Sequence, residues 1–163
     1  MSSASRFHAS LGNRTAVLVI LMLACLVTCH CDDDDGVINT SGPFVLTFRL
    51  AADYQDPHGG QPVNWALVQS SDGLRVVTGN GTLSTTGNPA FTLTTGAVLE
   101  SGIDYELHYW IDSNIDGGAL GVCDPEDIDH QGRTIFLAPA SDINFVKIYN
   151  PDHVEYVCDT FNP

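Results

Sequence analysis

The chain has 163 residues, 44% of them hydrophobic, and carries 20 Asp and Glu residues against 6 Lys and Arg, a formal net charge of −14. This length fits one domain of ordinary size. An acidic surface repels nucleic-acid phosphates and anionic lipid headgroups, which argues against both as partners and favours a cation or a basic protein. The alternative is that the acidity only keeps the protein soluble.

The N-terminal segment has the pattern of a secretory signal peptide. Residues 1–15 are polar with two arginines, and residues 16–27 are almost wholly apolar. This apolar run is shorter than the roughly 20 residues of a membrane-spanning helix and matches the h-region of a signal peptide. We therefore expect residues 1–28 to be a leader and the protein to function outside the cytoplasm.

Two segments at the end of the leader resemble the lipobox of bacterial lipoproteins. They read Met-Leu-Ala-Cys, ending at Cys25, and Leu-Val-Thr-Cys, ending at Cys29. The resemblance implies cleavage before Cys25 or Cys29 and a diacylglycerol on that cysteine, so that an N-terminal lipid anchors the protein to a membrane of the cell envelope. The small Ala24 slightly favours Cys25. A non-lipidated signal peptide and an uncleaved signal anchor are the alternatives.

An acidic segment follows the leader. Residues 29–42 include four consecutive aspartates at 32–35. A run of like charges repels itself and does not pack, so it stays extended and solvated. We expect residues 29–42 to be a flexible tether that holds the folded domain, residues 43–163, away from the membrane.

The domain itself has the period-two hydrophobic pattern of β-strands. The expected strands cover 44–50, 63–67, 74–76, 91–94, 105–111, 134–137, 143–149 and 154–157, with a short additional candidate at 82–86. Turn residues such as Gly, Pro, Asn and Asp separate them. The pattern predicts an all-β fold: a single β-sandwich of about seven or eight antiparallel strands.

Residues 99–107, Leu-Glu-Ser-Gly-Ile-Asp-Tyr-Glu-Leu, resemble a turn-into-strand segment of immunoglobulin-like, fibronectin-type and transthyretin-like domains. The resemblance implies that Tyr105 packs at a corner of the sandwich and that its hydroxyl bonds to the backbone. It carries no information about function. The alternative is that Tyr105 is simply an aromatic core residue.

The segment after the strand expected at 105–111 holds the clearest candidate site. Residues 112–117, Asp-Ser-Asn-Ile-Asp-Gly, resemble the first half of an EF-hand loop, in which oxygens from alternate residues converge on Ca²⁺ and the glycine permits a sharp turn. The twelfth position is Cys123 instead of Glu, so the remaining ligands must come from later acids. The predicted calcium ligands are Asp112, Asn114, Asp116, Asp124 and Glu126. The alternative is a solvated acidic loop whose Asp and Asn residues serve turns.

The domain has two cysteines, Cys123 and Cys158. In an oxidising compartment two lone cysteines most economically form one disulfide, which here would join the long loop to the strand expected at 154–157. Two buried free thiols are the alternative.

The function expected from these patterns is that of a non-enzymatic envelope lipoprotein, a β-sandwich binding or structural module with a calcium-binding acidic loop. The first alternative is a periplasmic or surface metal-handling protein that binds copper or zinc through His108, His130 and nearby acids. Neither histidine belongs to a His-x-x-x-His or Cys-x-x-Cys pattern. A small hydrolase is the third candidate, although the sequence has no Gly-x-Ser-x-Gly nucleophile elbow.

Overall fold

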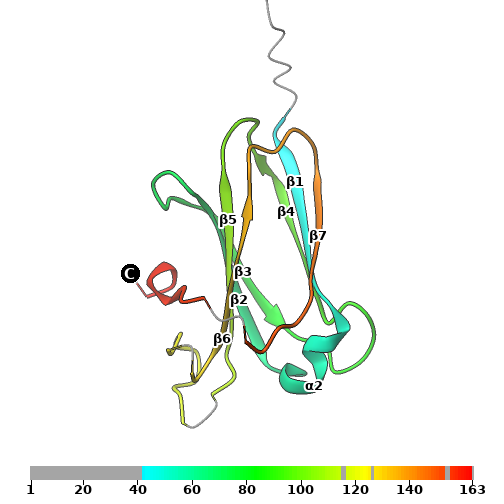
Figure 1. Ribbon diagram of the computed structural model, residues 1–163, viewed down its shortest axis with the longest axis vertical. Coiled ribbons are helices and arrows are strands. Elements are labelled where there is room, and N and C mark those ends of the chain that lie inside the picture. Colours follow the sequence, from blue (N-terminus) through cyan, green and yellow to red (C-terminus); the bar gives the residue numbers. More distant parts are fainter. Residues whose placement is uncertain (1–41, 115–116, 126, 153–154, 163) are drawn as a thin grey trace, which may run out of the picture. The chain divides into compact units, whose positions relative to one another are not determined.

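Seven β-strands in two sheets make up most of the computed structural model, which describes residues 42–114, 117–125, 127–152 and 155–162 (Figure 1). These residues belong to one unit, Thr40–Pro163. The predicted leader, with Cys25 and Cys29, and nearly all of the predicted tether lie outside the described residues. The strands are β1 (Phe44–Leu50), β2 (Pro62–Gln69), β3 (Arg75–Thr82), β4 (Phe91–Leu99), β5 (Tyr105–Ile111), β6 (His130–Phe136) and β7 (Ile143–Lys147). The short helices are η1 (Ala52–Tyr54), α2 (Gln55–His58) and η2 (Cys158–Thr160).

The strands form a three-stranded sheet, in the order β4-β1-β7, and a four-stranded sheet, in the order β3-β2-β5-β6. The predicted all-β sandwich is therefore confirmed. One pairing departs from the antiparallel pattern, because β7 runs parallel to β1. The cause is the path of the chain: β7 reverses the direction of β6 and joins the other sheet, where β1 already runs the same way as β7 (Figure 1).

Two of the expected strands are absent from the described residues. Residues 83–90 form the connection between β3 and β4, so the short strand expected at 82–86 was wrong except for Thr82, which ends β3. Residues 155–157 are not in a strand either; they lead into η2. Strand β7 ends at Lys147, two residues before the expected end at 149.

Strand β3 is longer than predicted because two glycines that signal a turn lie inside it. A Cβ atom at Gly79 would lie 2.5 Å from Cζ2 of Trp65, and one at Gly81 would lie 2.6 Å from Cε2 of Phe91. These glycines make room for the aromatic rings of Trp65 on the paired strand β2 and of Phe91 on β4 of the other sheet. Their role is packing, which the sequence alone does not distinguish from a turn.

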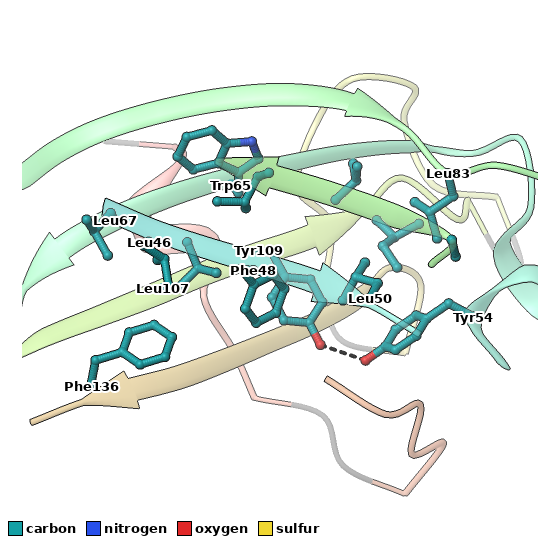
Figure 2. Packing of buried hydrophobic residues seen from close by; sticks show 14 of the residues in the cluster. Leu46, Phe48, Leu50, Tyr54, Trp65, Leu67, Leu83, Leu107, Tyr109 and Phe136 are labelled. Carbon is teal, nitrogen blue, oxygen red and sulfur yellow. Dashed lines mark hydrogen bonds between the residues drawn. The ribbon is translucent and has the colours of Figure 1, made fainter. Parts of the chain in front are cut away.

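The core lies between the two sheets, and the period-two pattern places its residues. Leu46, Phe48 and Leu50 of β1 are almost fully buried, as are Leu107 and Tyr109 of β5, which face them from the other sheet (Figure 2). At the entry to β5, the Tyr105 hydroxyl accepts a hydrogen bond from the Glu100 N–H at 3.0 Å and donates one to the Val98 carbonyl at 3.4 Å. The predicted corner geometry of Tyr105 is therefore confirmed.

A second, smaller apolar cluster covers the outer face of the four-stranded sheet. Trp110 of β5 points away from the main core and packs with Cys123, Val157, Cys158 and Phe161. Cys123 and Cys158 form the predicted disulfide, with a Cα–Cα distance of 5.4 Å. The disulfide joins the β5–β6 loop to the C-terminal segment at η2, and not to a strand as expected. This cluster fixes both segments against the sheet.

Candidate metal site in the loop between β5 and β6

The β5–β6 loop begins at the end of the sandwich where α2 also lies (Figure 1). Asp112 continues the sheet for one residue, since its N–H donates to the Pro62 carbonyl at 2.9 Å. Its side chain is only 4% exposed. The first predicted calcium ligand therefore starts from a rigid strand, which gives its carboxylate a fixed position.

Asn114 is held against Asp112 by the local backbone. Its φ angle of 47° lies in the left-handed region, which Asn tolerates better than most residues. The Asn114 side-chain amide donates to Oδ1 of Asp112, and the Gly121 N–H donates to Oδ2 of Asp112 at 2.7 Å. Oδ1 of Asn114 is buried and has no hydrogen-bond partner among the described residues. One oxygen of the predicted ligand set is thus left unsatisfied inside the protein.

Asp124 reaches the same place from the other side of the loop. Its Oδ2 accepts a hydrogen bond from the Ala119 N–H at 2.6 Å. A Cβ atom built on Gly118 would lie closest to Cγ2 of Ile128, then 2.7 Å from Oδ2 of Asp124 and 3.0 Å from Oδ1 of Asn114. The two oxygens therefore both lie close to the Gly118 backbone, where the Ile128 methyl group also packs, and a larger residue than glycine would not fit there.

Asp129 organises the loop through the backbone. Its Oδ1 accepts hydrogen bonds from the N–H groups of Ser113 and Asn114, at 3.0 and 3.3 Å, and its Oδ2 accepts one from the Asp124 N–H at 3.0 Å. The pKa of Asp129 is raised, chiefly by burial. The backbone hydrogen bonds offset part of this rise, and the nearby Asp112 carboxylate adds to it. Asp129 thus ties the two halves of the loop together, with each oxygen already occupied by the backbone.

Gln131 joins the loop to the C-terminal segment. This fully buried side chain donates to the Asp124 carbonyl at 2.7 Å and accepts from the Val157 N–H at 2.8 Å. Together with the disulfide, it fixes the backbone beside Asp124. This role was not predicted, because a lone glutamine in a strand has no characteristic sequence pattern.

Three of the five predicted calcium ligands, Asp112, Asn114 and Asp124, are therefore close together. Asp116 and Glu126 lie outside the described residues. Within the described part of the chain, no three side chains from His, Cys, Asp and Glu are already arranged as they would be around a metal ion. An ion would have to draw the loop oxygens together, and Asn114 would be one of its ligands.

The two histidines of the alternative metal site are on opposite faces of the four-stranded sheet. His108 pairs with Arg133, and His130 pairs with Ile111, whose side chain is in the core. On the outer face, His108 bonds to Thr160 Oγ1 at 2.7 Å through Nδ1 and to Glu106 Oε2 at 3.0 Å through Nε2. His108 and His130 therefore cannot share one ion.

The Glu106–His108–Thr160 chain has the order of a catalytic acid–imidazole–hydroxyl relay, but its partners indicate a structural role. Arg133 lies 3.5 Å from the same Glu106 oxygen, and Arg75 donates to the Thr160 carbonyl at 3.3 Å. These contacts hold η2 on the sheet.

No family model matches this sequence, and no similar protein was found among curated proteins or solved structures. In the described part of the chain, no helix is long and apolar enough to span a membrane.

Proposed function

We propose that this protein is a non-enzymatic lipoprotein of the cell envelope whose β-sandwich is a binding or structural module, and that calcium stabilises its β5–β6 loop. The observation that carries the calcium part is that side-chain oxygens of Asn114 and Asp124 both lie beside the Gly118 backbone, while the Asp112 carboxylate is held against the Asn114 amide. Oxygen donors of this kind are the ligands that Ca²⁺ takes in proteins.

The unsatisfied oxygen of Asn114 supports a ligand at this position. A buried polar atom without a partner is destabilising, and such atoms are rare in folded proteins. A cation beside Oδ1 of Asn114 would satisfy it and would offset the repulsion between the carboxylates of Asp112 and Asp124. The ordinary alternative is that these carboxylates only accept backbone N–H groups and that the loop binds no ion.

The ion would have to compete with hydrogen bonds that already exist. Asp112 and Asp124 each accept one backbone N–H, and a carboxylate can accept a hydrogen bond and bind a cation at once, because each oxygen has two lone pairs. The missing Glu at the twelfth position removes the usual bidentate ligand. We therefore expect the weak affinity of extracellular calcium modules, a dissociation constant of about 10⁻⁴–10⁻³ M.

The leader carries the envelope assignment. Its apolar run ends at two lipobox-like cysteines, and four aspartates follow directly. A disulfide in the folded unit supports an oxidising address. In this proposal the lipid binds the membrane, and the sandwich presents its surface to a protein or cation partner.

Thermal unfolding with and without calcium tests the calcium proposal. At ten times the dissociation constant, one bound ion should stabilise the purified protein by about 1.4 kcal/mol relative to protein in chelator. Asp112→Asn and Asp124→Asn should abolish most of that gain. Asp72→Asn is the matched control, because Asp72 also caps a backbone N–H, that of Leu74, in a remote turn. Equal melting temperatures in calcium and chelator, or an unchanged gain in both loop variants, would reject the calcium site.

A further inference from the structure

Five aromatic rings from distant parts of the chain pack together where β1 leads into α2. The members of this histidine–tyrosine cluster are Tyr54, His58, Tyr109, His130 and Tyr149. Three of them form a nearly equilateral triangle: the ring centroids of His58 and His130 are 4.9 Å apart, and Tyr149 lies 5.5 Å from the first and 5.4 Å from the second. His58 is 3% exposed and His130 is 8% exposed.

The environment of His58 fixes which ring nitrogen carries the proton. Nδ1 lies 2.8 Å from Oε1 of Gln61, an acceptor, and 3.3 Å from Oγ of Ser113. Nδ1 therefore carries the hydrogen and Nε2 has the lone pair. Nε2 is buried and has no hydrogen-bond partner among the described residues. Burial lowers the pKa of His58.

This arrangement is the one found at metal-binding histidines. A ligating imidazole usually donates its other ring N–H to an oxygen acceptor, which fixes the tautomer and the ring orientation. Gln61 has that role towards His58. An imidazole nitrogen binds zinc at about 2.0–2.1 Å, which places the ring centroid about 3 Å from the ion. Two imidazole rings bound to one tetrahedral ion, each with its centroid about 3 Å from that ion, have centroids about 5 Å apart. This is close to the 4.9 Å between the rings of His58 and His130.

We propose that His58 and His130 bind one transition-metal ion of the copper(II) or zinc(II) class, with the Tyr149 phenol oxygen as a third ligand. Imidazole suits both ions. The ion would connect α2, β6 and the segment after β7, three parts of the chain that are distant in sequence. This inference does not rest on the proposed calcium loop, since the two sites share no ligand.

Metal titration of the full-length protein tests the inference. The protein is first stripped with chelator, and its free thiols are alkylated, so that leader cysteines do not bind the metal. Calorimetric titration with copper(II) and zinc(II) should then give one ion per chain. His58→Gln and His130→Gln should each weaken binding at least tenfold. His108→Gln is the matched control and should leave the affinity unchanged, because His108 is on the outer face with Glu106 and Thr160.

Two further measurements keep the result interpretable if a histidine variant does not fold. Gln61→Leu removes only the outer hydrogen bond of His58 and should reduce affinity by about 10–100-fold in a folded protein. The electron paramagnetic resonance spectrum of the copper(II) protein should show two coupled nitrogens, and Tyr149→Phe should remove the phenolate-to-copper absorption band. No stoichiometric binding, binding unchanged in His58→Gln and His130→Gln, or a spectrum without imidazole nitrogen would overturn the proposal.

Discussion

Tyr109 connects the two sheets, the α2 end and strand β6. Its ring packs against Phe48 of the opposite sheet, with centroids 5.8 Å apart, and its hydroxyl lies 2.9 Å from that of Tyr54 (Figure 2). On the neighbouring strand, Gly132 pairs with Tyr109 and leaves room for the phenol. The position of Tyr109 therefore depends on the lack of a side chain at Gly132 and on the hydroxyl of Tyr54, which is distant in sequence.

Replacing Gly132 with Ala should destabilise the fold. The new Cβ would lie 2.5 Å from Cζ of Tyr109, a rigid ring atom that is already buried. Overpacking of this kind costs about 1–3 kcal/mol. Urea denaturation measures the change, and Gly96→Ala is the control, because a Cβ at Gly96 meets nothing within 4 Å. Equal effects of the two substitutions would show that the Tyr109 contact is unimportant.

The paired phenols predict an alkaline loss of stability. Burial raises the pKa of Tyr54 to about 12 and raises that of Tyr109 well above its ordinary value. An unfolded tyrosine ionises near its ordinary pKa of about 10. The contribution of the two buried, neutral phenols to folding stability is therefore complete below about pH 10 and is lost as pH rises towards 12. Denaturation of the chelator-treated protein between pH 8 and 11 should show a fall that is smaller in the Tyr54→Phe/Tyr109→Phe double variant. An equal fall in the double variant would contradict this assignment.

At the scale of elements, the sequence predicted strands well where side chains alternate and poorly where packing decides. The 44–50 and 105–111 strands are β1 and β5 with the same bounds. Strand β3 was cut short because Gly79 and Gly81 read as turn residues. The strand expected at 154–157 failed because Val157 packs on Trp110, outside any sheet. The local sequence pattern is enough to predict strands with alternating side chains. Strand ends that depend on packing are set by tertiary contacts, which the local pattern does not show.

The candidate site was predictable to a similar extent. The alternate spacing of Asp112 and Asn114 predicted their proximity, since it depends only on local backbone. Asp124 joins them because the disulfide and Gln131 fix the far side of the loop, which no spacing rule describes. The buried His58 was missed altogether, since a histidine beside a Pro and two glycines reads as part of an exposed turn.

The disulfide should contribute measurably to stability and to the burial of Trp110. Cys123 and Cys158 are 35 residues apart, and closing such a loop contributes roughly 3–4 kcal/mol in the chain-entropy model. Reduction should lower the free energy of unfolding by about this amount. It should also shift Trp110 fluorescence to longer wavelength, because the C-terminal segment that covers Trp110 is released. Trp65→Phe isolates the Trp110 signal. Unchanged fluorescence after complete reduction would mean that Gln131 and the apolar contacts alone hold the segment.

At the scale of the whole molecule, the lipobox-like segments at Cys25 and Cys29 predict a lipid at the N-terminus. Protein extracted from membranes should begin at Cys25 or Cys29 and carry the mass of a diacylglycerol on that residue. Cys25→Ala and Cys29→Ala tested separately identify the modified cysteine, because only one of them should abolish the added diacylglycerol mass. An unmodified chain recovered from the soluble fraction would contradict the lipoprotein assignment.

A crystal structure of the protein grown in millimolar calcium would show directly whether the β5–β6 loop binds an ion. We predict one ion beside Gly118, with oxygens of Asp112, Asn114 and Asp124 among its ligands at about 2.3–2.6 Å, the distance typical of calcium. Oδ1 of Asn114, which lacks a partner among the described residues, should be one of them. A loop without an ion at that calcium concentration, with Asp112 and Asp124 bonded only to protein donors, would rule out the proposed calcium site.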